Sequence, residues 1–348
     1  MLVSFIIPSH NSTHTVKWCL DSIYALSLKQ EEFEMIFVDD CSTDNTCEIV
    51  EAYSQSISKG KGVNNLTLLK QPKNNRQGAA RNRGVRNATG KYIVYVDSDD
   101  EVAGGIVQAL ELAEKNHLEM VAFHSQKVDE NGMTTEYKRL PYLEKEIFTG
   151  MQLQTEHPYW FTGPVAYVYL KSFLDKVGYA FAEEVLFEDS DYVNNHLYYA
   201  QRIGYVSKCG YRIHYNRSST THTMSYKHLA DYFLLGTRMQ KLYDKIDDKT
   251  TTYATSIQEG GSYNIWMAFR RLWKLDSTEA IKMFYKRIDE RADRAAYLDN
   301  KEPKYCWTLW TKLGLRHKAV MTYIVGLMIF CRKCLRTFKL YPSPKIDG

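Results

Sequence analysis

The chain has 348 residues, of which 44% are hydrophobic and 25% charged, a composition typical of a folded protein that excludes a disordered or collagen-like chain. At roughly 150 residues per domain, this length predicts about two domains, or one domain with a large extension. The net charge of +4 is too small to favour a nucleic-acid partner. Seven irregularly spaced cysteines, and a start without the basic residues of a secretory signal, predict free thiols in a cytoplasmic protein.

The first hundred residues alternate short apolar runs with helix-like stretches. Four strands are predicted, over residues 2–7, 33–38, 65–69 and 92–96, and Pro8 is expected to end the first. Apolar residues at helical spacing predict a helix over residues 16–26, with Ser12 or Thr13 as its N-cap. Near-continuous apolar strands separated by helices indicate a parallel sheet that is covered on both faces.

Polar residues follow three of these strands. Ser9-His10-Asn11 follows the first, Asp39-Asp40-Cys41-Ser42 the second, and Asp97-Ser98-Asp99-Asp100 the fourth. Ligands of such sheets bind beyond the carboxyl ends of the strands, so these residues are expected to meet at one site. Five carboxylates in one cleft are expected to need a cation, and a set of oxygen ligands favours a hard divalent metal.

Four segments together resemble the inverting family 2 glycosyltransferases with the GT-A fold, over roughly residues 1–220. They are SFIIPSHNS, VDDCSTDNT, GAARNRGVRNATGKYIVYVDSDD and FEDSDY. A lone DxD pattern occurs by chance, whereas four motifs in this order are specific. The resemblance implies an α/β fold with a mostly parallel central sheet flanked by helices. It also implies a nucleotide-sugar donor, usually a UDP-sugar, and Mn²⁺ or Mg²⁺ as the cofactor.

The resemblance assigns donor-binding and metal-binding residues. The donor-binding positions are Pro8, Ser9, Asn11, Asp40, Arg81, Asp97 and Ser98. Asp40 matches the acid that accepts a hydrogen bond from uracil N3–H, and Arg81 matches a basic position that can face the donor. Asp99 matches the metal ligand of the DxD pair. Asp97 matches the acid of the pair that lies towards the ribose, and it is also a candidate metal ligand. His222 is a further candidate metal ligand.

The last motif supplies the catalytic candidates Asp189 and Glu188. Inverting transfer needs a base that takes the proton of the acceptor hydroxyl, and a positioned base contributes about 10²–10⁴-fold. Asp189 matches this base, while Glu188 and Asp191 remain open as alternatives. Trp160 and Tyr159 are candidate acceptor-binding residues because aromatic faces stack on sugar rings, although a role in the core is equally open.

Ordinary structural roles remain open for several of these residues. Asp40 could cap the following helix, Arg81 could lie on a solvated helix face, and His222 could be a solvated loop residue. A nucleotidyltransferase and a dinucleotide-binding oxidoreductase are both disfavoured, because PSHNSTHT after the first strand contains no glycine. A non-catalytic carbohydrate-binding paralogue remains an alternative, since an intact motif is not an activity.

The C-terminal part carries most of the positive charge. Residues 301–348 hold ten basic and two acidic residues, a net +8, while the other 300 residues hold 35 basic and 39 acidic residues, a net −4. Residues 319–331 are uncharged but too few to span a bilayer, which takes about 20 apolar residues. Apolar residues flanked by basic clusters predict a helix that lies on an anionic membrane surface. Packing of this helix on the catalytic domain is the alternative.

The sequence therefore predicts three parts. Residues 1–220 form the glycosyltransferase domain, residues 221–300 a helical extension, and residues 301–348 a basic amphipathic tail. A membrane-bound tail predicts a protein peripheral to the cytoplasmic membrane face. The acceptor is then expected to be a glycan, lipid-linked, in the synthesis of a cell-surface polysaccharide.

Overall fold

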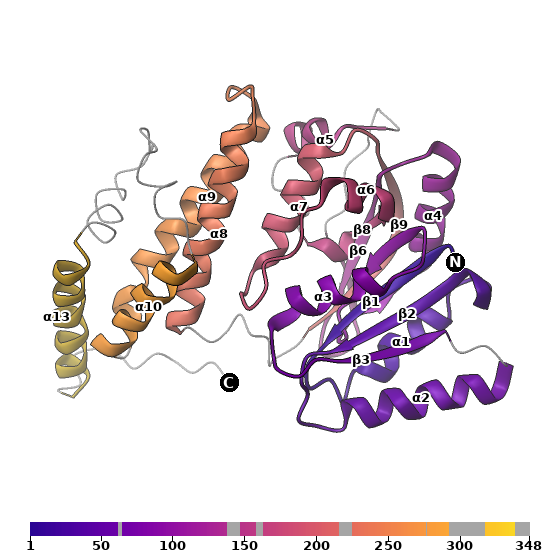
Figure 1. The fold of residues 1–348 in the computed structure, drawn as a ribbon, viewed down its shortest axis with the longest axis horizontal. Helices are drawn as coiled ribbons and strands as arrows, with labels where there is room; N and C mark the ends of the chain where they lie inside the picture. The colour runs from indigo at the N-terminus through magenta and orange to yellow at the C-terminus, as the bar shows by residue number, and fades with distance from the viewer. Residues whose placement is uncertain are drawn as a thin grey trace. The chain divides into compact units, whose positions relative to one another are not determined.

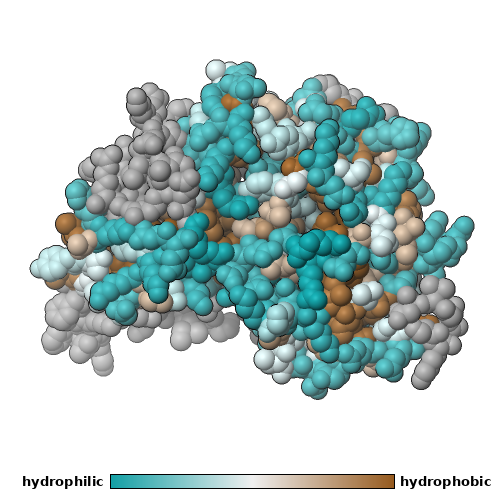
Figure 2. Space-filling view, in the orientation of Figure 1, coloured by the Kyte–Doolittle hydropathy of each residue, from teal (hydrophilic) through white to brown (hydrophobic). Residues whose placement is uncertain are grey.

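The computed structural model describes residues 1–61, 65–137, 147–157, 163–215, 225–275, 277–291 and 317–337. The chain divides into two compact units, Met1–Arg217 and Ser218–Gly348. In the described residues the first unit is an α/β structure and the second is built from helices (Figure 1). The face drawn in Figure 2 is mainly hydrophilic, as expected from the charged content of the chain.

One mixed sheet forms the centre of the first unit. Its nine described strands are β1 (Val3–Ser9), β2 (Phe33–Asp39), β3 (Leu66–Lys70), β4 (Tyr92–Tyr95), β5 (Glu101–Val102), β6 (Met120–Val128), β7 (Thr134–Tyr137), β8 (Tyr167–Leu170) and β9 (Ile203–His214). Their order is β3-β2-β1-β4-β8-β6-β9-β5, with β7 paired to β6. The first four strands are parallel, as predicted, while β8 is antiparallel to both β4 and β6. The predicted α/β fold is confirmed.

The central strand β1 is longer than predicted. All of its residues are buried, and the expectation that Pro8 ends the strand is wrong because β1 continues to Ser9. On the β4 side, pairing extends only to Ile6, whose carbonyl accepts a hydrogen bond from the Val96 N–H. Residues two apart in a strand, such as Ile6 and Pro8, face the same neighbouring strand with their backbone N–H and C=O positions. Pro8 therefore faces β4 beyond the paired residues, and its missing N–H costs no sheet hydrogen bond.

The first helix begins at Val16, as predicted, but it ends at Tyr24, two residues early, and its N-cap differs from the prediction. Neither Ser12 nor Thr13 is its N-cap, because the helix starts at Val16 after Thr15, whose side chain makes no capping hydrogen bond. The Ser12 hydroxyl instead lies 2.7 Å from Ser98 Oγ, beyond β4. The Ser12 side chain, which the local pattern predicts as the helix N-cap, therefore makes a tertiary contact instead.

Helices pack on the sheet of the first unit (Figure 1). They are α1 (Val16–Tyr24), α2 (Thr46–Lys61), α3 (Arg76–Asn87), α4 (Gly105–Asn116), α5 (Gly150–Glu156), α6 (Lys171–Val177) and α7 (Glu188–Tyr199), with short 3₁₀ turns η1 (Gln30–Glu32) and η2 (Pro164–Ala166). α3 packs on β1 and β2, and α4 packs on β6 and β9. Gly84 lets α3 approach the sheet closely, because a Cβ there would lie 2.3 Å from Ile6 Cγ2.

The second unit has its own core. Its described elements are α8 (Tyr226–Lys245), α9 (Thr252–Arg270), η4 (Leu272–Lys274), α10 (Thr278–Arg291) and α13 (Lys318–Thr337). α13 contains the uncharged run and contributes Met321, Val325 and Ile329 to this core. Its opposite face leaves Tyr323 and Leu327 exposed. Among the helices that the structure describes, none is long and apolar enough to cross a membrane.

Candidate active site

The predicted site lies where the winding of the sheet changes direction. From β1 the chain winds outward through β2 to β3, and it then returns through α3 to β4 on the other side of β1. The neighbouring carboxyl ends of β1 and β4 form a topological switch point, where open α/β sheets bind ligands. Ser9 ends β1, and Asp97 follows β4 by two residues.

Hydrogen bonds join the segments that follow the first, second and fourth strands. Ser12 Oγ accepts a hydrogen bond from Ser9 Oγ at 2.9 Å and lies 2.7 Å from Ser98 Oγ. Asn11 is exposed and has a left-handed φ of 55°. Its side-chain oxygen accepts a hydrogen bond from the Thr43 N–H at 2.8 Å. The structure thus places the predicted donor-binding residues of β1 and β4 at one edge.

Asp40 lies directly after β2 and is only 3% exposed. Its Oδ1 accepts hydrogen bonds from the Asn75 N–H and from Gln71 Nε2, both at 2.8 Å. The alternative that Asp40 caps the following helix is not observed, because Asp44 accepts the hydrogen bond from the N–H of Thr46, the first residue of α2. Asp40 is therefore fixed in orientation by the segment that leads into α3.

Tyr211 of β9 fixes the acidic loop after β4. Its hydroxyl accepts a hydrogen bond from the Asp97 N–H at 3.0 Å and donates one to Asp100 Oδ2 at 2.9 Å. The other oxygen of Asp100 accepts from the His214 N–H at 2.8 Å. Asp100 is buried and serves the loop, whereas Asp97 and Asp99 are half-buried. Tyr211 lies 114 residues after Asp97, and no local sequence pattern marks it as part of this site.

Arg81 of α3 joins three carboxylates although its side chain is completely buried. Its Nη2 lies 2.9 Å from Asp97 Oδ1, and its Nη1 lies 2.8 Å from Glu188 Oε1 and 2.7 Å from Asp189 Oδ1. One guanidinium thus links the first acid of the DxD motif to both catalytic candidates. The alternative that Arg81 lies on a solvated helix face is excluded by its burial.

The three acids in the first turn of α7 differ in exposure. The side chain of Asp189 is 41% exposed, whereas that of Glu188 is 4% exposed. Asp191 is completely buried, and its carboxylate accepts hydrogen bonds from the Tyr179 hydroxyl at 2.9 and 3.0 Å. Asp189 is therefore the acid of this turn that is most accessible to solvent.

Burial and crowding shift the proton affinities of these groups. Burial, and then the neighbouring Asp189 charge, raise the pKa of Glu188 to about 8. Partial burial of the Asp189 carboxyl also raises its pKa, although the nearby Arg81 charge opposes this shift. Burial alone would lower the pKa of Arg81, but the three carboxylates hold it well above its ordinary value. Arg81 is therefore a permanent cation, and Glu188 is the member of the group that most readily keeps a proton.

Asp97 and Asp99 offer a donor set for a divalent cation. Within the described residues, no cluster of three or more His, Cys, Asp or Glu side chains could hold a metal ion. Two carboxylates still fit Mg²⁺ or Mn²⁺, since substrate phosphates and waters commonly complete the ligand shell of such ions. The carboxylates are less crowded by uncompensated charge than expected, because Asp97 pairs with Arg81 and the carboxylate of Asp40 accepts a hydrogen bond from Gln71.

The structure brings most of the predicted site residues together and leaves three undescribed. Those at the switch point and around Arg81 are Ser9, Asn11, Asp40, Arg81, Asp97, Ser98, Asp99, Glu188 and Asp189, and Pro8 is buried within β1. The acceptor candidates Trp160 and Tyr159 and the metal candidate His222 lie outside the described residues. The acceptor-binding role of Trp160 and Tyr159 and the metal-binding role of His222 therefore stay predictions.

Sequence comparisons identify relatives of the chain. A family model described as "Glycosyl transferase family 2" matches residues 4–178, half of the chain. EpsJ of Bacillus subtilis, an uncharacterized glycosyltransferase, is 29% identical over 245 residues, which are 67% of this chain and 66% of EpsJ. TarS of Staphylococcus aureus, a poly(ribitol-phosphate) beta-N-acetylglucosaminyltransferase, is 35% identical over 103 residues. These are 29% of this chain but only 17% of TarS, so the chain matches a small part of that relative.

Solved structures support the same fold. TarS 1–349 in complex with UDP-GlcNAc superimposes with a TM-score of 0.60 at 18% identity, over 100% of this chain and 95% of that structure. The mannosyltransferase PcManGT from Pyrobaculum calidifontis, in complex with GDP-Man and Mn²⁺, gives a TM-score of 0.51 at 14% identity, over 97% of this chain and 87% of that one. At these identities the likeness establishes the fold, and it confirms the predicted GT-A architecture.

Proposed function

This chain belongs to glycosyl transferase family 2, and we propose that it transfers a sugar with inversion from a UDP-sugar to a glycan acceptor. The observation that carries the proposal is the position of Asp189. It is the exposed acid in the first turn of α7, and Arg81 holds it in the same ion-pair group as Asp97. A base beside the donor-binding edge of the sheet is the arrangement that direct displacement at an anomeric carbon requires.

In this proposal the site residues divide the tasks of donor binding, metal binding and proton transfer. Asp40 accepts a hydrogen bond from the uracil, and Asp97 faces the ribose. Asp99, with Asp97, would hold Mn²⁺ or Mg²⁺, which would supply Lewis-acid stabilisation for the charge on the diphosphate leaving group. Asp189 takes the proton of the acceptor hydroxyl as its oxygen attacks the anomeric carbon and the bond to the diphosphate breaks.

The choice of donor and acceptor is supported by the relatives. TarS has been solved with UDP-GlcNAc, and its name states a poly(ribitol-phosphate) acceptor. PcManGT has been solved with Mn²⁺. These likenesses support a UDP-sugar, a divalent cation and a cell-surface polymer or its lipid-linked precursor as the substrates and cofactor of this chain.

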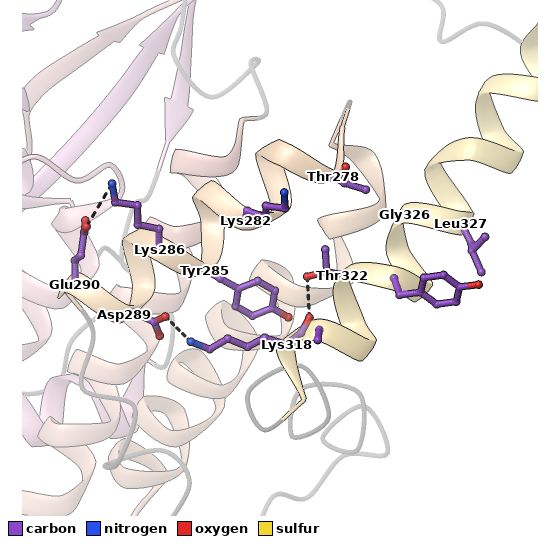
Figure 3. Close-up of a pocket in the computed structure, with 12 residues that line it drawn as sticks. Thr278, Lys282, Tyr285, Lys286, Asp289, Glu290, Lys318, Thr322, Gly326 and Leu327 are labelled. Carbon is purple, nitrogen blue, oxygen red and sulfur yellow. Dashed lines mark hydrogen bonds and ion pairs between the residues drawn. The ribbon is translucent and has the colours of Figure 1, made fainter.

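A membrane location at the cytoplasmic face also belongs to the proposal. A groove of about 910 Å³ lies between α10 and α13, with Tyr285 and Thr322 on its walls and Leu327 at its edge (Figure 3). Lys282 and Lys318 line the same groove, each paired with an acid (Glu279 and Asp289), and the apolar face of α13 beside it remains exposed. Exposed apolar side chains next to lysines are typical of a helix that contacts anionic lipid. Such contact would bring the enzyme to a lipid-linked acceptor.

The test of function is release of UDP from a panel of UDP-sugars with Mn²⁺ or Mg²⁺. We expect turnover that is lost in EDTA, and a loss of about 100-fold or more in Asp189→Asn with UDP binding retained. Asp175→Asn changes an acid of α6 that is 58% exposed, and it should turn over like the wild type. Absence of nucleotide binding in the wild type would reject the proposal. Nucleotide binding without turnover would favour the non-catalytic carbohydrate-binding alternative.

A further inference from the structure

The burial and the ion pairs of Arg81 are not those expected of a residue that only binds the donor or of a surface residue. Its side chain is completely buried, and its two terminal nitrogens are each within 2.9 Å of a carboxylate. One of these carboxylates, Asp97, belongs to the donor half of the site. Another, Asp189, is the proposed base, and it lies in α7, 108 residues after Arg81 in the chain. A single guanidinium therefore fixes the distance between the two halves.

Aromatic packing and hydrogen bonds hold the guanidinium in place. The Arg81 guanidinium carbon lies 5.2 Å from the ring centroid of Phe181, and this ring stacks on Tyr192 at 3.6 Å with an interplanar angle of 7°. Tyr192 is bonded in turn to the Tyr95 hydroxyl at 2.8 Å. The Asn82 side chain accepts a hydrogen bond from the Phe181 N–H and donates one to the Phe181 carbonyl, both at 3.0 Å. The ring beneath Arg81 is thus fixed by α3, β4 and α7.

We infer that Arg81 is a positioning residue, which acts on the transfer reaction by holding Asp189 at a set distance and orientation from Asp97. This inference rests on the proposed function. A planar guanidinium can pair with carboxylates on different sides in one plane, whereas a lysine ammonium is a point charge on a flexible stem. Since a displacement of about 1 Å can cost about 100-fold in rate, the rigid link has a direct kinetic effect.

The inference predicts that Arg81 and Asp189 act as a unit. We expect Arg81→Met to lower kcat for UDP release by about 100-fold, and Arg81→Lys to restore part of this loss because it keeps the charge. If Arg81 acts through Asp189, the double variant Arg81→Met/Asp189→Asn loses no more than Asp189→Asn alone. Arg86→Met changes an exposed arginine of the same helix and should leave kcat unchanged.

The outcomes separate this inference from the function on which it rests. If the wild type is active and the losses of kcat in the two single variants multiply in the double variant, Arg81 acts independently of Asp189. This result would overturn the inference but not the proposed function. An inactive wild type would overturn the proposed function and the inference with it. Circular dichroism will show whether Arg81→Met folds. If it does not, the same double-mutant cycle of Arg81 and Asp189 is measured in a protein that also carries Glu188→Gln. This change removes a buried carboxylate that Arg81→Met would leave without a cation.

Discussion

At the scale of single residues, the first turn of α7 shows how environment separates similar side chains. Asp191 is buried and bonded to Tyr179, Glu188 is buried against Arg81, and Asp189 reaches solvent. The sequence motif offers all three acids as bases, since nothing in it states which of them faces the cleft. The greater exposure of Asp189 supports our proposal that it is the base, and burial leaves Glu188 as a group that holds a proton.

The raised pKa of Glu188 predicts a pH dependence of stability. Its value of about 8 in the folded protein lies above the ordinary 4.5, so the folded state binds the proton more tightly. This contribution is complete below pH 4.5 and is lost as the pH rises through 8. Glu188→Gln keeps the neutral form, and we expect it to be more stable than the wild type at high pH by on the order of 2 kcal/mol.

Urea unfolding near neutral pH and in mildly alkaline buffer measures this difference. The gain of Glu188→Gln over the wild type should grow with pH, whereas Glu31→Gln, at an exposed position, should change stability equally at both. A gain that is the same at both pH values would show that the Glu188 carboxyl is ionised throughout.

At the scale of elements, α3 depends on close contact with the segment before α7. A Cβ on Gly78 would lie 2.4 Å from the Ala182 carbonyl oxygen, which is a backbone atom and cannot move by a rotamer change. Gly78→Ala should therefore displace the segment that carries Phe181 and lower the free energy of unfolding by about 1–3 kcal/mol. It should also lower turnover, because Phe181 packs against the Arg81 guanidinium.

Thermal unfolding and UDP release measure these two effects of Gly78→Ala. Gly104→Ala is the matched control, because a Cβ there would be 3.7 Å from the nearest atoms, which belong to the flexible end of Lys208. If the two variants unfold alike, the close approach of α3 to this segment does not contribute to stability.

Elements with a strong local pattern could be predicted, and tertiary contacts could not. The strands β1 to β4 were placed within two residues at each end, because buried parallel strands have near-continuous apolar sequence. The motif residues after β1, β2 and β4 lie at strand ends, as expected, whereas Glu188 and Asp189 lie at the start of α7. Neither the burial of Arg81 against Glu188 nor the hydrogen bond between Tyr211 and Asp97 could be predicted, since the two residues of each pair are 107 and 114 residues apart in the chain. Ser12 could not be predicted correctly for the same reason, because its hydroxyl contacts Ser98 instead of capping the first helix.

At the scale of the whole molecule, the basic C-terminal part is not a separable tail. α13 contributes Met321, Val325 and Ile329 to the core of the second unit. Deleting residues 301–348 would therefore remove core side chains together with any lipid-binding surface, and a loss of membrane binding could then reflect unfolding. The exposed face of α13 has to be changed without touching its buried face.

Tyr323 and Leu327 allow this separation, since they are 69% and 47% exposed and lie one helical turn apart on α13. We expect Tyr323→Ser/Leu327→Ser to fold normally and to lower binding to anionic phospholipid vesicles by about tenfold or more in flotation, because burying each apolar side chain in lipid contributes about 1.5–3 kcal/mol. Tyr263→Ser, at a position of α9 that is 51% exposed, controls for the loss of a surface aromatic side chain and should float like the wild type. Equal flotation of all three proteins would show that α13 does not contact lipid, and the acceptor would then have to reach the enzyme without help from this helix.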